Sequence, residues 1–293
     1  MSNLLATVMP SKRNKTIYVS DREANEFQSW LTLTEPTTLA QIKNRVFLGD
    51  AIEVLPLLPA ESVDLIVADP PYNLGKKFGA GRLRLSEADY KNWCRDWLTD
   101  CHRLLKPNGS IYICIDWPNS TMVHELLSNL FHVQNRITWQ RDKGRGSKKN
   151  WKNNMEDIWF ATKTRQYTFN IDAVKIKRPV IAPYVDKKGK PKDWFEENGT
   201  KYRLTHPSNI WTDMVVPFWS MPENTEHPTQ KPEKLITRLL QASSQKHDVV
   251  LDPFMGSGTT AVAAKKLKRH YIGIEKDKKF YVLIHKRLES LYG

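Results

Sequence analysis

Short apolar runs alternate along the chain with longer segments in which apolar residues recur at helical spacing. Residues 63–68 form one such run, which stops at Asp69 and is typical of a buried strand. Over residues 93–105 apolar side chains recur three or four residues apart, which predicts a helix that ends at the breaker cluster 106–109. The same pattern predicts further strands at 110–115, 133–140, 249–251 and 270–274, and further helices at 121–130, 232–242, 259–267 and 278–291.

The order of these elements indicates the fold class. Strands that alternate with helices favour a mostly parallel sheet covered on both faces, so we expect an α/β protein with a doubly wound sheet. The 293 residues, 40% of them apolar, suffice for one large domain or for one domain with an insertion. The first 45 residues are an unassigned N-terminal arm, in which residues 20–33 fit a capped helix.

Positive charge is concentrated in the middle of the chain. The formal net charge is +13, and residues 143–203 hold 16 Lys and Arg against 7 Asp and Glu. A chain this basic typically meets nucleic acid, although a basic surface that only aids solubility is the alternative. The interleaved aromatics suit base stacking, unless they fold inward beneath a solvated surface. These aromatics are Trp151, Trp159, Tyr167, Phe169, Tyr184, Trp194, Phe195 and Tyr202.

Apolar runs and cysteines bear on location and metal binding. No run of about 18 apolar residues could span a membrane, and the first ten residues do not resemble a signal peptide. Cys94, Cys101 and Cys114 are odd in number and lack Cys-x-x-Cys spacing, which indicates a reducing compartment and neither disulfides nor a zinc site. We therefore expect a cytoplasmic protein without a metal ion and without a membrane partner.

A glycine-rich loop follows the strand predicted at 249–251. Gly256, Gly258 and Ala261 fit the Gly-x-Gly-x-x-Ala fingerprint, in which small residues let a nucleotide approach the backbone at a helix N-terminus. Glu275 ends the next strand, 17 residues after Gly258, where it could bind ribose hydroxyls; a tight turn with a solvated Glu is the alternative. Only 18 residues follow Glu275, so the remaining strands must come from the N-terminal half, which argues against an ordinary dehydrogenase.

A second motif directly follows the strand predicted at 63–68, where open α/β sheets bind ligands. Its prolines stiffen the turn and leave the carbonyl of Pro70 free to accept a hydrogen bond. The carboxylate of Asp69 and this carbonyl can together accept both hydrogens of an exocyclic amino group, while Tyr72 offers a ring face for an unstacked base. A rigid turn with an exposed aromatic is the alternative. The motif reads Asp69-Pro70-Pro71-Tyr72.

These motifs resemble those of the amino-group DNA methyltransferases. Residues 69–72 are similar to the catalytic motif of that family, residues 252–260 to its S-adenosylmethionine motif, and residues 227–232 also match it. The order, with the catalytic motif first and the cofactor motif last, resembles the permuted β class of bacterial restriction–modification and orphan enzymes. The resemblance covers about residues 45–142 and 220–293.

The resemblance implies an organisation and a set of site residues. The fold would be of the S-adenosylmethionine-dependent methyltransferase type, with a catalytic half at 46–142, a basic target-recognition region at 143–225 and a cofactor-binding half at 226–293. Asp252 would face the methionine amino group and Glu275 the ribose, while Lys231 could instead start a helix. The catalytic residues would be Asp69, Pro70, Pro71 and Tyr72; the cofactor-binding residues Asp50, Asp69, His227, Thr229, Lys231, Asp252, Phe254, Gly256, Ser257, Gly258, Thr259 and Glu275; and the DNA-binding residues Arg145, Lys148, Lys149, Lys152 and Arg178.

The implied reaction is direct methyl transfer from S-adenosylmethionine to an amino group of a base flipped out of double-stranded DNA, with S-adenosylhomocysteine as product. Asp rather than Ser at the first catalytic position favours adenine N6, with cytosine N4 as the alternative. A non-catalytic nucleic-acid-binding protein on a relic methyltransferase fold also stays open. The resemblance further allows a homodimer, a cognate restriction endonuclease and a nucleoid-associated place in a bacterial or phage cytoplasm.

Overall fold

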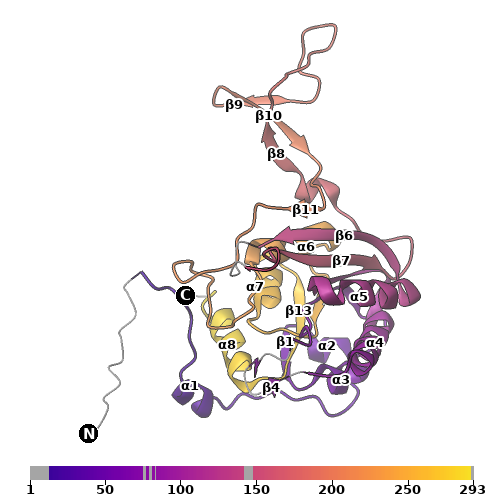
Figure 1. Cartoon of the computed structure of the whole chain (residues 1–293), viewed down its shortest axis with the longest axis vertical. Helices are drawn as coiled ribbons and strands as arrows, with labels where there is room; N and C mark the ends of the chain where they lie inside the picture. Colours follow the sequence, from indigo (N-terminus) through magenta and orange to yellow (C-terminus); the bar gives the residue numbers. More distant parts are fainter. Residues whose placement is uncertain (1–12, 75–76, 79–80, 83, 142–147, 292–293) are drawn as a thin grey trace.

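An eight-stranded sheet forms the centre of the molecule (Figure 1). The computed structural model describes residues 13–74, 77–78, 81–82, 84–141 and 148–291. Neighbouring strands are parallel except where β7 pairs with β5 and β6, which confirms the doubly wound, mostly parallel α/β fold. In sheet order the strands are β1 (Arg45–Leu48), β13 (His270–Glu275), β12 (Val249–Asp252), β2 (Val63–Ala68), β5 (Leu105–Ile115), β7 (Met155–Thr162), β6 (His132–Gln140) and β11 (Ile210–Trp211).

The two C-terminal strands lie between strands of the N-terminal half. β13 pairs with β1, and β12 pairs with β2, all in parallel. This arrangement confirms that the sheet is completed by the N-terminal half in permuted order. It also brings the carboxyl ends of β2, β12 and β13 to one edge of the sheet, which is where open α/β sheets bind their ligands.

Three helices cover one face of the sheet, namely α3 (Ala51–Val54), α4 (Glu87–Leu104) and α5 (Trp117–Leu130). Ser86 starts α4 by accepting a hydrogen bond from the backbone N–H of Asp89 at 3.1 Å. The apolar stripe of α4 then buries Trp97 and Cys101 against the sheet. Burial of a side chain as large as Trp97 contributes on the order of 2–3 kcal/mol, so this stripe fixes the helix on the sheet.

The other face is covered by α6 (Glu233–Ser243), α7 (Thr259–Lys266) and α8 (Lys278–Glu289). Leu65 and Val67 of β2 pack in this second core, whereas Ile66 and Ala68 pack in the first. Because β2 is buried on both faces, its sequence is an almost unbroken apolar run rather than an apolar–polar alternation.

The helix ends just before the cluster 106–109, as predicted, but the predicted start of the next strand at residue 110 is wrong, because the cluster belongs to β5. The pairing of β5 with β2 shifts register between Val63 and Leu65, and this irregularity accommodates the Pro and Gly of the cluster. A Cβ at Gly109 would lie 3.0 to 3.1 Å from the backbone oxygens of Lys106 and Asp64. Glycine therefore allows a close approach of two strands here and does not end the strand.

The N-terminal segment contains a shorter helix than residues 20–33 would allow. α1 (Asp21–Glu26) begins at a capping box in which the side chains of Ser20 and Glu23 each bond the backbone of the other. Beyond the helix, Phe27 and Trp30 pack on Tyr281 of α8, with ring centroids 5.9 and 5.6 Å apart. These aromatic contacts attach the N-terminal segment to the last helix.

The basic segment divides into two parts. β7 is a buried strand of the central sheet, so its Phe160 turns inward and stacks on Tyr112 at 4.6 Å, whereas Phe169, whose ring lies 5.8 Å from that of Phe160, stays 43% exposed. Residues 171–205, which we call the arm, project from the body (Figure 1). The arm consists of η2 (Ile171–Val174) and the antiparallel strands β8 (Ile176–Pro179), β9 (Phe195–Glu197) and β10 (Thr200–Thr205).

Four short elements complete the structure: α2 (Leu39–Ile42), η1 (Leu55–Leu57), β3 (Lys77–Phe78) and β4 (Gly81–Arg82). Among the helices of the described residues, none has the length and apolar character that crossing a membrane requires.

Candidate active site

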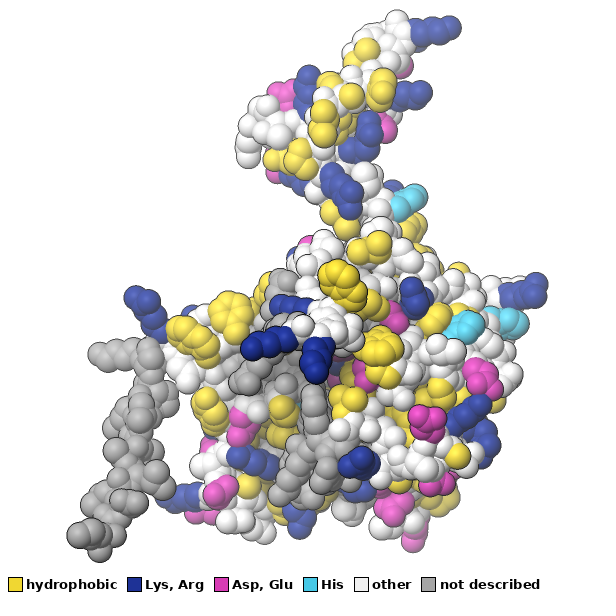
Figure 2. Space-filling view, viewed as in Figure 1, with side chains coloured by type: hydrophobic (Ala, Val, Ile, Leu, Met, Phe, Trp, Pro, Cys, Tyr) yellow, Lys and Arg dark blue, Asp and Glu magenta, His cyan; other side chains and the backbone are white. Residues whose placement is uncertain are grey.

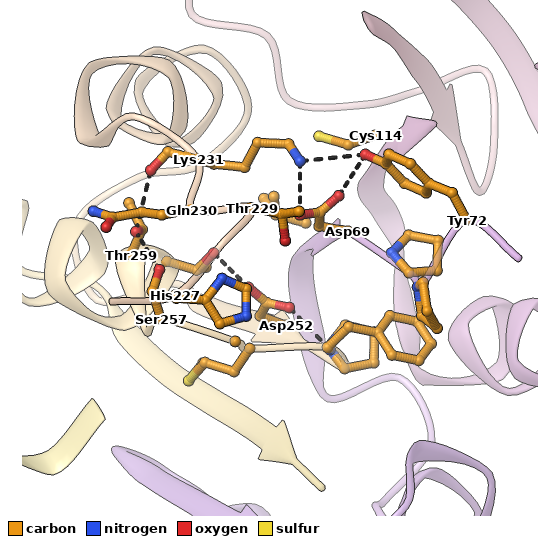
Figure 3. Close-up of a pocket in the computed structure, with 18 of the residues that line it drawn as sticks. Asp69, Tyr72, Cys114, His227, Thr229, Gln230, Lys231, Asp252, Ser257 and Thr259 are labelled. Carbon is orange, nitrogen blue, oxygen red and sulfur yellow. Dashed lines mark hydrogen bonds and ion pairs between the residues drawn. The ribbon is translucent and has the colours of Figure 1, made fainter. Parts of the chain in front are cut away.

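One cavity of about 700 Å³ opens at the carboxyl ends of β2, β12 and β13. Asp69, Pro70, Pro71 and Tyr72 line it from the end of β2, and residues 252–257 line it from the end of β12. The two motifs are far apart in the sequence, and they meet because β2 and β12 are neighbours in the sheet. Figure 3 shows the two sides facing each other.

The glycine loop owes its shape to two left-handed residues. Gly256 has a φ of 54° and Gly258, the N-cap of α7, has a φ of 77°. A Cβ on Gly256 would lie 3.0 Å from the ring of His227, and one on Gly258 would lie 3.0 Å from Ile284. Both positions therefore require glycine for conformation and for space. We call the side formed by this loop, His227 and Glu275 the glycine-loop wall.

Two buried carboxylates stand on the glycine-loop wall. Asp252 accepts hydrogen bonds from the hydroxyl of Thr260 at 2.6 Å and from the backbone N–H of Phe254 at 3.0 Å. Glu275 accepts from the backbone N–H groups of Gly256 at 2.6 Å and Asp277 at 2.7 Å. Burial raises the pKa of each carboxyl group to about 7. A positively charged or donating ligand would favour the ionised forms.

His227 presents an unsatisfied polar atom in this part of the cavity. Its ring is packed against Phe280 at 4.4 Å, and burial, with a further contribution from the Lys231 cation, lowers the pKa of His227 to about 4. The imidazole is therefore neutral at physiological pH. Its buried Nδ1 has no hydrogen-bond partner among the described residues, as expected of a group that bonds a ligand.

The remaining cofactor candidates also line the cavity. Asp50 caps α3 by accepting the backbone N–H of Ile52 at 3.0 Å, and its second oxygen lies 2.6 Å from Nζ of Lys276. Phe254 packs against Trp93 and Trp97 of α4, with centroids 5.5 and 5.2 Å apart. The others that line the cavity are Thr229, Ser257 and Thr259. Gly258 is not among the lining residues.

On the opposite side, the catalytic motif is fixed by its backbone carbonyls. The hydroxyl of Tyr90 in α4 donates to the carbonyl of Pro71 at 2.8 Å, and the side-chain amide of Asn119 in α5 donates to the carbonyl of Tyr72 at 3.1 Å. The hydroxyl of Tyr72 donates to Oδ1 of Asp69 at 2.6 Å. The rigid turn therefore holds both functional side chains in the cavity.

Lys231 reaches the catalytic motif, not the glycine loop. Its Nζ donates to Oδ2 of Asp69 at 2.7 Å and lies 3.2 Å from the hydroxyl oxygen of Tyr72 (Figure 3). Burial alone would lower the pKa of this lysine, but the carboxylates of Asp69 and Glu156 outweigh burial and raise it. Only its backbone faces the other side, where the carbonyl accepts a hydrogen bond from Thr259.

Glu156 and Arg141 were missed by the sequence analysis. Oε1 of Glu156 lies 2.8 Å from Nζ of Lys231, and its Oε2 lies 3.0 Å from the guanidinium of Arg141. The available signal was an acidic pair, Glu156 and Asp157, inside an otherwise apolar strand pattern. We call Asp69, Tyr72, Arg141, Glu156 and Lys231 the carboxylate wall.

The carboxylate wall has the geometry of a small cation site. Ligand atoms of Asp69, Cys114 and Glu156 all lie within 4.8 Å of one another. The ammonium group of Lys231 bonds both carboxylates of this group, so the protein supplies the cation from its own chain.

The predicted DNA-binding residues fall in two places. Lys148, Lys149 and Lys152 are exposed in a segment that reaches the mouth of the cavity at Asn153, and Trp151 beside them is 93% exposed. Arg178 is exposed on β8 of the arm, whose surface mixes basic and apolar side chains (Figure 2). Arg145 lies outside the described residues.

Comparisons with known proteins agree with this geometry. The N6/N4 DNA methylase family model matches residues 63–286. The DNA adenine methyltransferase YhdJ of Escherichia coli (strain K12) is 36% identical over 259 residues, which cover 87% of this chain and 86% of that protein. The type II methyltransferase M.HpaI of Haemophilus parainfluenzae is 33% identical over 252 residues, covering 85% and 75%.

A solved structure shares the fold. The M1.HpyAVI–SAM complex is 26% identical, has a TM-score of 0.57, and covers 83% of this chain and 98% of its own. The family match begins at β2, ahead of the catalytic motif, and ends in α8, beyond Glu275, so it takes in both walls of the cavity. The chain belongs to the N6/N4 DNA methylase family.

Proposed function

We propose that this chain transfers a methyl group from S-adenosylmethionine to the N6 amino group of an adenine flipped out of double-stranded DNA. The observation that carries the proposal is that Asp69 and Asp252, which begin the catalytic and the glycine motifs, line one cavity of about 700 Å³. A cavity of this size accommodates a nucleoside-sized cofactor next to a single base.

The glycine-loop wall fits S-adenosylmethionine. Asp252 would bind the methionine amino group and Glu275 the ribose hydroxyls, and these ligand donors would favour the ionised form of each buried carboxyl group. The unpartnered Nδ1 of His227 offers a further polar contact. When bound, the cofactor supplies an electrophilic methyl group, and S-adenosylhomocysteine is the product. Asp50, Thr229, Phe254, Ser257 and Thr259 would complete the pocket.

The carboxylate wall fits the target base. Asp69 and the carbonyl of Pro70 would accept the two amino hydrogens and so direct the nitrogen lone pair toward the methyl group. Tyr72 lies against the base, with its hydroxyl anchored to Asp69. The attack is direct, so the wall needs no nucleophile of its own.

Two features favour adenine over cytosine as the target. Asp69 occupies the first catalytic position, where Ser is more typical of cytosine N4 enzymes. The relative YhdJ, which matches most of this chain, is named a DNA adenine methyltransferase. Cytosine N4 is the alternative target, and it would use the same residues in the same way.

DNA would be held by the exposed basic residues in and beside the arm. Lys148, Lys149 and Lys152 are exposed in the segment that leads to Asn153, a residue that lines the cavity, so they could bind phosphates next to the flipped nucleotide. Arg178 of the arm could read base edges, and Arg145 remains a prediction from the sequence. A homodimer, a cognate restriction endonuclease and a nucleoid-associated place in the bacterial or phage cytoplasm belong to the same proposal.

The substitution Asp69→Ala tests this assignment. It removes the acceptor for one of the two amino hydrogens, so we expect kcat to fall at least about 100-fold, as for other lost transition-state contacts. The dissociation constant for S-adenosylmethionine should change little, because Asp252 and Glu275, which would bind the amino group and the ribose of the cofactor, lie on the other wall. Turnover and calorimetric binding measured on the same preparation separate the two effects. Wild-type turnover in the variant would contradict the assignment.

A further inference from the structure

The hydroxyl of Tyr72 faces two carboxylates but carries one hydrogen. Its oxygen lies 2.6 Å from Oδ1 of Asp69 and 2.9 Å from Oε1 of Glu156, so either carboxylate can accept that hydrogen. Burial, and then the charges of Asp69 and Glu156, raise the pKa of Tyr72 well above its usual value. The hydroxyl therefore keeps its hydrogen at physiological pH and is a donor with a choice of two acceptors.

Two cations fix both acceptors. Nζ of Lys231 lies 2.7 Å from Asp69 and 2.8 Å from Glu156, and Arg141 holds the second oxygen of Glu156 at 3.0 Å. Two positive and two negative groups make the cluster neutral overall, so each carboxylate can remain an acceptor despite its burial. The side chain of Glu156 is 2% exposed, which leaves protein groups as its main partners.

The target amino group would compete with Tyr72 for Asp69. Each oxygen of Asp69 already receives one hydrogen bond, from Tyr72 on Oδ1 and from Lys231 on Oδ2. Turning the Tyr72 hydrogen toward Glu156 requires rotation about one C–O bond and no movement of the ring. That rotation frees Oδ1 of Asp69 without leaving a buried polar hydrogen unpaired.

We propose that Glu156 is a positioning residue for methyl transfer, which accepts the Tyr72 hydrogen while Asp69 holds the target amino group. The inference rests on the proposed function, since that function gives Asp69 the amino group. Glu156 acts through Tyr72 and Asp69. Its strand, β7, is paired on both sides with β5 and β6, so the second acceptor stays at a fixed distance during the exchange.

Two substitutions separate the acceptor from the charge. Glu156→Asp keeps the negative charge that Lys231 and Arg141 need but withdraws the oxygen from Tyr72 by one methylene group. Glu156→Gln keeps the length and removes the charge. We expect the single-turnover rate of methyl transfer to fall about 10- to 100-fold in both variants, the worth of one hydrogen bond to a charged group. The dissociation constant for S-adenosylmethionine and the thermal unfolding midpoint check that each variant is folded.

A double-mutant cycle with Tyr72→Phe provides the decisive measurement. The phenylalanine side chain has no hydroxyl to redirect, so adding Glu156→Asp to Tyr72→Phe should change the rate by less than about twofold. The matched control is Asp157→Asn, the next acid along β7, which accepts a hydrogen bond from Ser120 at 2.6 Å instead of from Tyr72. The effect of Asp157→Asn on the rate should be the same in the protein with Tyr72 and in the Tyr72→Phe variant.

Either of two results would overturn the proposal. One is full activity of Glu156→Asp beside an inactive Glu156→Gln, which would leave Glu156 only a counter-ion for Lys231 and Arg141. The other is an equal loss from Glu156→Asp with and without the Tyr72 hydroxyl. Failure of the proposed function would look different, because the wild-type protein itself would then methylate no DNA amino group.

Discussion

The two walls of the cavity are built by different means. On the glycine-loop wall the backbone does most of the positioning: two glycines take left-handed conformations, and backbone N–H groups hold Asp252 and Glu275. On the carboxylate wall charged side chains hold one another, and they come from the ends of β2 and β6, from β7 and from the segment before α6. The geometry of a wall positioned by its backbone depends on the local sequence. The geometry of a wall positioned by contacts between side chains depends on which strands pair.

The largest expected effect comes from removing the cation of the carboxylate wall. Lys231→Met leaves the partly buried carboxylate of Asp69 facing the buried carboxylate of Glu156, with Arg141 as the remaining cationic partner of Glu156. We expect a loss of about 3–5 kcal/mol in the free energy of unfolding, as for other broken buried ion pairs. Urea titration measures this loss.

The matched control for Lys231 is Lys276→Met, since Lys276 pairs with Asp50 in a largely exposed position. It should leave the unfolding midpoint almost unchanged. Equal destabilisation by the two substitutions would mean that the carboxylate wall is not a buried charge cluster.

The next largest effect is expected from alanine substitutions that test why the glycine-loop wall needs glycine. Gly258 and Gly189 have almost the same φ, 77° and 76°, but a Cβ on Gly258 would meet Ile284 at 3.0 Å while one on Gly189 would meet no described atom within 4 Å. Gly189→Ala should therefore cost about 1–2 kcal/mol from backbone strain alone. Gly258→Ala should cost about 1–3 kcal/mol more from overpacking, and it should weaken cofactor binding. Similar unfolding midpoints for the two variants would contradict this account.

Cofactor affinity should depend on pH through the glycine-loop wall. Burial raises the pKa of Asp252 to about 7, and a ligand ammonium group would favour its ionised form. Affinity should therefore fall about tenfold per pH unit below 7 and level off above it. In the ligand-free protein the sign is opposite: the raised pKa favours the fold at low pH, and this contribution is lost as the pH rises through about 7. Calorimetry at about pH 6, 7 and 8 measures the affinity, and Asp252→Asn should flatten the profile.

The smallest effect concerns the exposed lysines in the segment before Asn153. Replacing Lys148, Lys149 and Lys152 together with Ala should reduce the slope of log affinity for DNA against log salt by up to about 2.7, since each phosphate contact contributes about 0.9. Fluorescence anisotropy over a range of salt concentrations gives the slope. An unchanged slope would remove these lysines from the DNA interface.

The contrast between the two walls also explains which parts of the site could be predicted from the sequence. The strand-to-glycine turn, its capping glycine and Glu275 follow from local patterns, and the structure has each of these elements within two residues of the prediction. The permuted order also followed, because the catalytic motif precedes the glycine loop in the sequence. The fold class was therefore accessible without coordinates.

The carboxylate wall was not accessible in the same way. Glu156 reaches Tyr72 because β7 inserts antiparallel between β5 and β6, and residues 143–203 were interpreted by charge, which concealed a buried strand. The ammonium group of Lys231 lies at the catalytic motif because the segment before α6 runs beside the cavity. The spacing of residues in the sequence does not predict the path of this segment. Long-range pairing of this kind is a tertiary property.

The most direct test follows the methyl group. The protein is incubated with S-adenosylmethionine labelled in the methyl group and unmethylated genomic DNA, and the DNA is then digested to nucleosides. The account predicts label in N6-methyldeoxyadenosine. Label in N4-methyldeoxycytidine would keep the mechanism and overturn the target base. Bound cofactor without any label in DNA would contradict the central claim that both walls serve one methyl transfer.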